Sequence, residues 1–259
     1  MFIYVLHFEM ATQFYLTLPS NSSLEYFPNN TVANFKVKLA ESIEMTGEWE
    51  VALAEIKYPH SWSTIREGNQ QTFIYKLGTG FDETGLIPDG HYKSIPDLVR
   101  KLNRCMTKEA QTKIKFSYVA SRRKVKINVP KGGYVLITGD IATTLGFEQD
   151  TVIEKETTSP YVADVNGGFS SMYVYTNIVD AQFVGDVKVP LLRIVNTQGN
   201  YGDNVNASFR YMQYVPIKVK SFETIEINIK DDKNENVSFG FGKSIATLHF
   251  KQSRSQYFI

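Results

Sequence analysis

The sequence predicts a mainly β protein whose strands form an antiparallel sandwich or barrel. Five runs rich in β-branched and aromatic residues follow one another in the last third of the chain, at 173–179, 187–195, 207–214, 217–229 and 245–250. Gly, Asn, Asp or Pro lies in each break, which is typical of consecutive strands. The breaks are too short for crossover helices, so the pattern argues against parallel βαβ units.

The N-terminal part of the chain adds strands to this sheet. Residues 13–18 (QFYLTL) form the first predicted strand, which ends at Pro19 and a Ser-Asn-Ser-Ser cluster. Residues 32–39 form the second. The third, 49–58, has apolar side chains on both faces, so we expect it to be central and covered on both sides. A short strand at 72–77 follows.

The middle of the chain has a different character. A loop with three glycines precedes the one convincing helix, which Ser94 caps with Asp97 in its first turn. A hairpin of 114–119 and 124–129 follows, then a strand at 134–137 and a single turn capped by Asp140. Apolar residues recur at helical spacing after the cap: Ile95, Leu98, Val99, Leu102, Cys105 and Met106.

These elements lie between two all-β stretches, so the sequence predicts a small α+β insertion domain with its own core. We place the insertion at 84–158, with the polar run 148–159 as its return linker. The β domain then comprises 10–83 and 159–252. Residues 1–9 and 253–259 are predicted to be flexible termini.

Composition excludes several functional classes. Lys and Arg number 28 against 27 Asp and Glu, so the net charge is +1, without the basic excess expected of a protein that coats nucleic acid. The apolar start of the chain is far shorter than the roughly 20 residues that span a bilayer, so no membrane span is predicted. Cys105 is the single cysteine, which excludes an intramolecular disulfide.

The motifs of common catalytic and metal sites are absent. There is no phosphate-binding loop, dinucleotide fingerprint, HExxH pair or GxSxG elbow. Cys105 falls on the apolar stripe of the predicted helix, where a small buried side chain is the simpler interpretation than a nucleophile. The sequence therefore predicts no catalytic, cofactor or metal site. The four histidines stand far apart, without partners at ligand spacing: His7, His60, His91 and His249.

Two charge clusters have simple interpretations. Asp231, Asp232 and Glu235 lack the spacing of a calcium loop and predict a solvated hairpin tip. The basic run within 122–131 predicts a charged hairpin surface, with phosphate contact as the alternative. What remains is a β protein rich in Tyr and Phe, and such surfaces bury protein partners. We expect a structural or interaction protein, not an enzyme.

Several longer sequence segments resemble those of a known protein family. They occur at 14–23 (FYLTLPSNSS), 26–31, 46–56 (TGEWEVALAEI), 58–62, 184–186, 189–193 and 248–250. In these segments the chain resembles the minor capsid (penton) proteins of Polinton/Maverick elements and adintoviruses. The resemblance extends from about residue 13 to 252. These are virus-like DNA transposons of animal genomes.

The resemblance implies an antiparallel single jelly-roll sandwich, with 84–158 as an insertion that projects outward. It implies a homopentamer at the five-fold vertices of a virus-like particle, beside a double-jelly-roll major capsid protein. Localisation would be the virion, with assembly inside the host cell, in the nucleus. No cofactor, membrane span or specific nucleic acid is expected.

A five-fold ring needs a heterologous interface, in which one face of a subunit meets a different face of the next. We expect this interface at the flanks and loops of the jelly roll. Phe27 and Trp62 have a core position as the alternative, and His249 a cross-strand contact. The subunit-interface candidates are Tyr26, Phe27, Trp62, Tyr201 in the 196–206 loop, and His249.

Two alternatives of other classes remain open at this point. One is a cell-attachment or carbohydrate-binding β-sandwich module, with a groove of exposed aromatics on 84–158. The other is a nucleic-acid-binding module that uses the hairpin within 122–131, for which affinity would fall steeply with salt.

Overall fold

The computed structural model describes residues 12–65, 71–167 and 169–253. The chain divides into two compact units. Unit 1 combines Met1–Ser61 with Ser171–Ile259, and unit 2 is Trp62–Ser170. Of the predicted flexible termini, residues 1–9 and 254–259 lie outside the described residues, and residue 253 is described.

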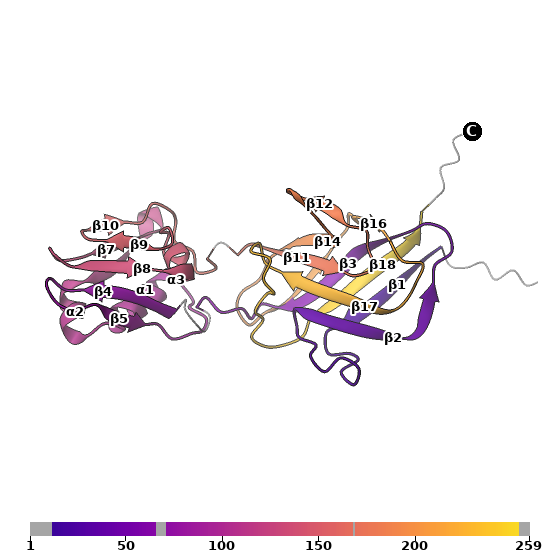
Figure 1. The fold of residues 1–259 in the computed structure, drawn as a ribbon, viewed down its shortest axis with the longest axis horizontal. Coiled ribbons are helices and arrows are strands. Elements are labelled where there is room, and N and C mark those ends of the chain that lie inside the picture. Colours follow the sequence, from indigo (N-terminus) through magenta and orange to yellow (C-terminus); the bar gives the residue numbers. More distant parts are fainter. Residues whose placement is uncertain (1–11, 66–70, 168, 254–259) are drawn as a thin grey trace, which may run out of the picture. The chain divides into compact units, whose positions relative to one another are not determined.

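Unit 1 contains two larger antiparallel sheets and a separate two-stranded hairpin of β12 (Gln182–Val184) and β13 (Val187–Val189) (Figure 1). The strands of sheet 1 are, in spatial order, β1 (Gln13–Pro19), β18 (Ile245–Gln252), β3 (Trp49–Pro59) and β15 (Asn204–Ser208), with β16 (Val215–Pro216) also paired to β3. The strands of sheet 2 are β14 (Leu191–Asn196), β11 (Ser171–Thr176), β17 (Ser221–Lys230) and β2 (Asn34–Glu44).

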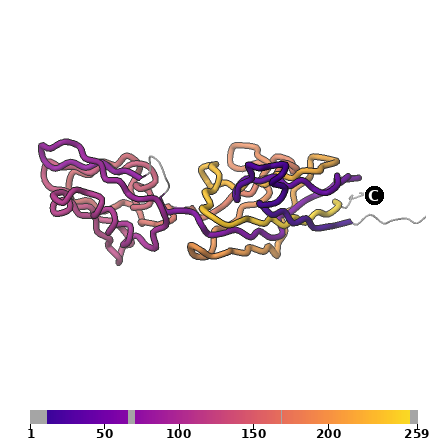
Figure 2. Tube along the Cα trace, turned by 90° about the horizontal axis from the view of Figure 1, so that it is seen from below, coloured from indigo at the N-terminus to yellow at the C-terminus, as the bar shows by residue number. Residues whose placement is uncertain are grey.

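This strand order is that of a jelly roll. Numbered along unit 1 alone, with β12, β13 and β16 left aside, the main strands read 1-8-3-6 in sheet 1 and 5-4-7-2 in sheet 2. The chain therefore passes from one sheet to the other at each connection except β11 to β14, which gives the two Greek keys of this fold. Figure 2 shows the first and last described strands, β1 and β18, side by side. The predicted antiparallel jelly roll is confirmed.

Alternation along the strands builds the core of the sandwich. In β17 the side chains of Ile225, Ile227 and Ile229 are buried, while the residues between them face outward. Phe250 of β18 is fully buried and stacks on Phe222 of β17, with ring centroids 5.8 Å apart, so this pair joins the two sheets. The third predicted strand is central as expected, since β3 lies between β18 and β15.

Unit 2 has its own sheets and helices. One sheet has the order β5 (Glu83–Leu86), β4 (Thr72–Lys76), β8 (Tyr134–Ile137) and β9 (Thr151–Ile153), and the other the order β10 (Thr157–Thr158), β7 (Lys124–Asn128) and β6 (Lys115–Val119). The helices are α1 (Ile95–Arg104), α2 (Lys108–Lys113), α3 (Gly139–Thr144) and the 3₁₀ turn η2 (Ala120–Arg122).

A separate hydrophobic core holds unit 2 together, with Phe73, Leu98 and Phe116 among its buried residues. The predicted helix is α1: Ser94 precedes it, and its hydroxyl oxygen accepts a hydrogen bond from the backbone N–H of Asp97. Asp140, in contrast, lies within the first turn of α3 and does not cap it, because Thr138 occupies the N-cap position.

The boundaries of the two units differ from the predicted ones. Unit 2 extends beyond 84–158 at both ends, because β4 pairs with β5 and β8 and not with the jelly roll. The predicted return linker 148–159 instead contains β9 and β10, each of which extends a sheet of unit 2. The predicted strand 187–195 is divided at Pro190 into β13 (Val187–Val189) and β14. The predicted strand 207–214 stops early, since β15 ends at Ser208.

Gly146, which follows α3, has a left-handed backbone conformation that favours glycine. Its φ is +82°, and a Cβ there would overlap the carbonyl oxygen of Tyr161. We expect Gly146→Ala to destabilise unit 2 by more than about 2 kcal/mol, since left-handed backbone alone costs a side chain roughly 1–2 kcal/mol. Gly78→Ala is the matched control, because Gly78 has a φ of +53° and open space around it. Urea denaturation measures the loss of unfolding free energy in both variants. Equal losses would show that the overlap of the added Cβ with the carbonyl oxygen of Tyr161 does not contribute.

Candidate interaction surfaces

The outer face of sheet 2 carries three adjoining hollows, which we call together the sheet groove. The first, of about 330 Å³, lies between the 26–30 loop and the outward side chains of Lys36 and Glu226. The second, of about 200 Å³, lies over Glu226, Asn228 and Tyr175. The third, of about 350 Å³, lies between Tyr175 and the β12–β13 hairpin. Glu226 joins the first hollow to the second, and Tyr175 joins the second to the third.

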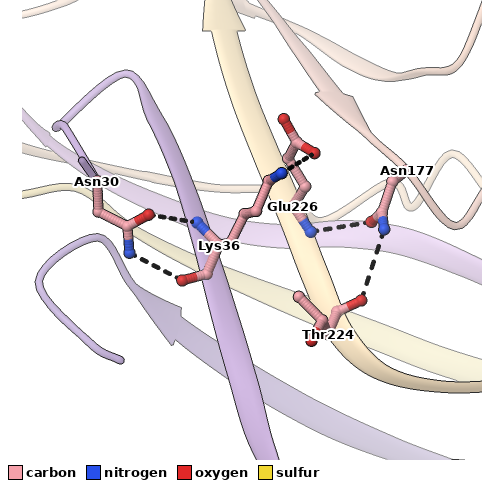
Figure 3. A network of polar contacts seen from close by, with 5 residues as sticks. All are labelled: Asn30, Lys36, Asn177, Thr224 and Glu226. Atoms are coloured by element: carbon pink, nitrogen blue, oxygen red, sulfur yellow. Dashed lines mark hydrogen bonds and ion pairs between the residues drawn. The ribbon is translucent and has the colours of Figure 1, made fainter. Parts of the chain in front are cut away.

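Two asparagine side chains fix the walls of the groove (Figure 3). Asn30 binds the backbone of Lys36 twice: its amide oxygen accepts from Lys36 N at 2.9 Å, and its amide nitrogen donates to Lys36 O at 2.8 Å. The amide oxygen of Asn177 accepts from the backbone N–H of Glu226 at 2.9 Å. Between these two clamps, Lys36 Nζ lies 3.5 Å from Glu226 Oε2. The hydrogen bonds of Asn30 and Asn177 to the backbone thus hold the loop and strands around the groove. The ion pair of Lys36 and Glu226 lies between them.

Asn228 and two tyrosines form the middle of the groove. Asn228 Oδ1 is buried and has no hydrogen-bond partner among the described residues. Tyr173 and Tyr175 are two positions apart on β11, so their rings lie on the same, outward face. Burial, together with the neighbouring Tyr173, raises the pKa of Tyr175, so its hydroxyl stays protonated and can donate a hydrogen bond.

A short hairpin borders the groove. It consists of β12 (Gln182–Val184) and β13, joined by a turn at Gly185, whose φ is +61°. Phe183 is 76% exposed and Val187 51% exposed, so two large apolar side chains on this hairpin face solvent. The ammonium of Lys188 lies 4.7 Å from the centre of the Phe183 ring. Exposed apolar groups on a projecting element are typical of contact surfaces.

Sheet 1 presents a different group of rings. Tyr15 of β1 stacks on His249 of β18, with ring centroids 4.3 Å apart. His249 Nδ1 is hydrogen-bonded to the hydroxyl of Tyr214 at 2.8 Å, and Lys251 Nζ lies 3.6 Å from the centre of the Tyr214 ring. Burial, and secondarily the charge of Lys251, lowers the pKa of His249, so its ring is neutral in the folded protein near pH 7.

His249 makes the stability of unit 1 depend on pH. Below its ordinary pKa of 6.5, the unfolded chain takes up a proton that the folded chain does not. The free energy of unfolding should therefore fall as the pH drops from about 6.5 toward the lower pKa of the folded state. We expect His249→Gln to reduce this loss, measured as the difference between urea midpoints at about pH 8 and about pH 5.5. An unchanged difference in the variant would contradict the assignment.

The predicted interface residues are dispersed over the structure. Tyr26 is exposed and Phe27 partly buried, and both line the first hollow of the groove. Tyr201 is exposed and packs edge-on against Phe241 in the neighbouring loop, with ring centroids 6.0 Å apart. Trp62 is buried in unit 2 against Phe169. Trp62 and His249 thus take the core and cross-strand positions that the sequence left as alternatives.

The cysteine, the basic hairpin and the acidic cluster identified in the sequence have structural roles or local contacts. Burial raises the pKa of the Cys105 thiol, which keeps it in the less reactive protonated form. On the basic hairpin, Lys126 pairs with Glu156 at 2.7 Å and Lys124 donates to the carbonyl of Pro160 at 2.7 Å. Asp231 was predicted in a solvated tip, but it is buried and accepts hydrogen bonds from two backbone N–H groups of the turn.

Within 12–65, 71–167 and 169–253, no three His, Cys, Asp or Glu side chains gather where a metal ion could sit. None of the helices in this part of the chain combines the length and apolar character that a membrane crossing requires.

No model of a known protein family matches the sequence, and a search of curated proteins finds no match. Among solved structures, the mavirus penton protein is similar, with a TM-score of 0.50 and 11% identity over 93% of this chain and 99% of that chain. A chain from the cryo-EM structure of the Sputnik virophage gives a TM-score of 0.49 and 8% identity over 94% of this chain and 98% of that chain. At 11% identity the likeness to the mavirus protein concerns the fold, and at 93% coverage it includes both units.

Proposed function

We propose that this chain is a structural capsid protein, a penton (minor capsid protein) that forms the five-fold vertices of a virus-like particle. The observation that carries the proposal is the shared fold with a protein described as a mavirus penton protein, over nearly the full length of both chains. The sequence phrases that resemble Polinton/Maverick penton proteins support the same assignment.

The function of such a protein is to assemble with copies of itself into a ring. A ring of five identical subunits closes when one face of each subunit binds a different face of the next. Unit 1 offers two chemically distinct faces: the Tyr15 and His249 stack on sheet 1, and the groove with its hairpin on sheet 2. Among the predicted candidates, Tyr26, Phe27 and Tyr201 keep accessible surface for such contacts. We place the ring contacts on unit 1 and propose that unit 2 projects from the vertex.

The proposal includes partners and a place of assembly. A vertex protein must also bind the shell around it, which we propose to be a double-jelly-roll major capsid protein. The site of action would be the virion, and assembly would take place inside the host cell, in the nucleus. No turnover of a substrate is part of this function.

The deciding experiment is a mass measurement in solution. The full chain is examined by native mass spectrometry and analytical ultracentrifugation, alone and with the major capsid protein of the same element. We expect a species five times the 29.5 kDa of one chain, in at least one of the two samples. A chain that stays monomeric in both samples, or a closed ring with another number of subunits, would overturn the proposal.

A further inference from the structure

Positive charge is concentrated in one stretch of unit 2. Residues 100–131 contain eleven Lys and Arg side chains and one acidic residue, Glu109, which pairs with Lys113 at 2.6 Å. The net charge of the whole chain is only +1, so the rest of the chain is acidic overall. The stretch supplies the second half of α1 and all of α2, β6, η2 and β7. The balanced net charge therefore conceals a strongly basic part of the surface.

The pairing of β6 with β7 gathers several of these cations on one face. Phe116 of β6 and Val125 and Ile127 of β7 are buried in the core of unit 2. Because side chains alternate along a strand, the residues between them point away from that core. On this outward side the opposite residues are Lys115 and Asn128, Ser117 and Lys126, and Val119 and Lys124.

The helix α1 and the turn η2 extend this face. The side-chain amide of Asn103 in α1 accepts from Phe116 N at 2.9 Å and donates to Phe116 O at 2.8 Å, so α1 lies along the edge of β6 that β7 leaves unpaired. Arg104 follows Asn103 and is exposed, as are Arg122 and Arg123 at the turn between the strands. We call the following six residues the basic face: Arg104, Lys115, Arg122, Arg123, Lys124 and Lys126.

Most charges of the basic face have no carboxylate partner. Lys126 pairs with Glu156 at 2.7 Å, and Lys124 donates to the carbonyl of Pro160, which leaves its charge in place. The other four form no ion pair within the described part of the chain: Arg104, Lys115, Arg122 and Arg123. Exposed cations of this kind create a positive potential that attracts anionic polymers.

Arg123 occupies a backbone position that favours glycine. Its φ is +52°, in the left-handed region that a side chain enters only at a steric cost. Its backbone N–H donates to Ala120 O, a bond that glycine would make equally well. The backbone alone therefore does not account for an arginine here. A residue held in such a conformation points to a role for its side chain.

The surroundings favour a sulfated polysaccharide over a nucleic acid. Among the described positions on the outward side of β6 and β7 there is no aromatic ring on which an unpaired base could stack, since Tyr118 packs against the core. Flanked by α1 and β10, the β6–β7 pair is also wider than the two-stranded ribbon that a major groove admits. Sulfate groups along a sugar chain need neither feature and match separate Lys and Arg side chains.

We propose that the basic face binds a sulfated polysaccharide, whose sulfate groups contact the guanidinium groups of Arg122 and Arg123 and the ammonium group of Lys115. This site differs from the groove of exposed aromatics considered for 84–158 from the sequence, because charge and not ring stacking supplies the affinity. It does not depend on the proposed vertex function, because the basic face lies within unit 2 and the ring contacts are proposed on unit 1.

The test is a titration of the full chain into fluorescently labelled heparin, followed by anisotropy. It is performed at about 50 mM and about 500 mM NaCl, because the higher concentration screens exposed charges. The comparison polymers are hyaluronan, which has carboxylates but no sulfates, and a short DNA duplex. We expect heparin to bind at the lower salt concentration, more tightly than either comparison polymer, and to bind far more weakly at the higher one.

Arg123→Gly separates binding from folding. We expect it to weaken heparin binding about tenfold, because a charge-assisted contact is lost. The urea midpoint of unit 2 should stay the same or rise, since glycine relieves the left-handed backbone. Arg122→Gln, at the exposed neighbouring position, should weaken binding by a similar factor without a change in the backbone.

Lys76→Gln is the matched control, because it removes one positive charge from the opposite side of unit 2. Phe73 of β4 packs against Phe116 of β6, with ring centroids 5.6 Å apart, so the sheets that contain β4 and β6 face each other across the core. Lys76 is three positions after Phe73 on β4, so it points outward on the far sheet. Its replacement should leave heparin affinity unchanged.

Several results would overturn the proposal. They are the absence of heparin binding at low salt, equal or tighter binding of DNA or hyaluronan, and a loss of affinity in Lys76→Gln as large as in Arg123→Gly. If Arg123→Gly lowers the stability of unit 2, Arg122→Gln decides, and unchanged heparin affinity in that variant would reject the site. Neither arginine variant should change the oligomeric state, so this proposal and the vertex function fail separately.

Discussion

Phe250→Ala should strongly destabilise the jelly roll and leave the stability of unit 2 unchanged. Phe250 is fully buried, lies parallel to Phe14 with ring centroids 4.7 Å apart, and stacks on Phe222 of the opposite sheet. Its truncation opens a cavity between the sheets and removes both ring contacts. The expected loss is about 3–5 kcal/mol, a large part of the roughly 5–15 kcal/mol that stabilises a typical domain.

The two tryptophans make this prediction measurable, since each unit contains one of them. Trp49 is in β3 of unit 1, and Trp62 is in unit 2. In a Trp62→Phe background, fluorescence therefore follows the urea unfolding of unit 1, and in a Trp49→Phe background that of unit 2. Phe250→Ala should lower the midpoint reported by Trp49 and leave the midpoint reported by Trp62 in place.

Phe116→Ala is the complementary variant, because Phe116 is fully buried in the core of unit 2. It should lower the midpoint reported by Trp62 alone. If either variant shifts both midpoints by the same amount, the two units unfold as one cooperative body, and the independence of their cores would be refuted.

The sequence predicted those elements whose burial imposes a regular period. Strands β17 and β18 alternate because one face of each packs into the sandwich, and α1 was found from its cap and apolar stripe. The extent of unit 2 was predicted too narrowly. An alternating run such as β4 looks the same in either unit, and only its pairing with β5 and β8 shows where it belongs.

The short strands and the groove were not predicted from the sequence, for related reasons. β9 is three residues long within a polar run, and its one fully buried apolar residue, Ile153, gives no periodic signal. The groove combines side chains from β2, β11 and β17, which are distant in the sequence. Tyr26 and Phe27 were found as aromatic residues of a turn, but no local pattern marks Asn228 as the floor of a groove.

Phe183→Ser should prevent ring formation if the vertex function is correct. Phe183 lies on a hairpin that its own unit leaves uncovered, and an aromatic anchor at the centre of an interface contributes about 2 kcal/mol or more. A closed ring of five contains the contact five times, so the loss per ring is on the order of 10 kcal/mol. The monomer should fold normally, because an exposed side chain contributes little to its stability.

Sedimentation at matched concentrations, in the condition under which the wild type forms rings, provides the measurement. Phe81→Ser is the control, since it makes the same chemical change at a residue of unit 2 that is 93% exposed. We expect the Phe183 variant to sediment as a monomer and the Phe81 variant as the wild type. Normal rings with Phe183→Ser would remove the hairpin from the interface, and loss of rings with Phe81→Ser alone would move the contact to unit 2. In either case a face of unit 1 other than the hairpin, or unit 2 itself, would have to supply the apolar area that closes the ring.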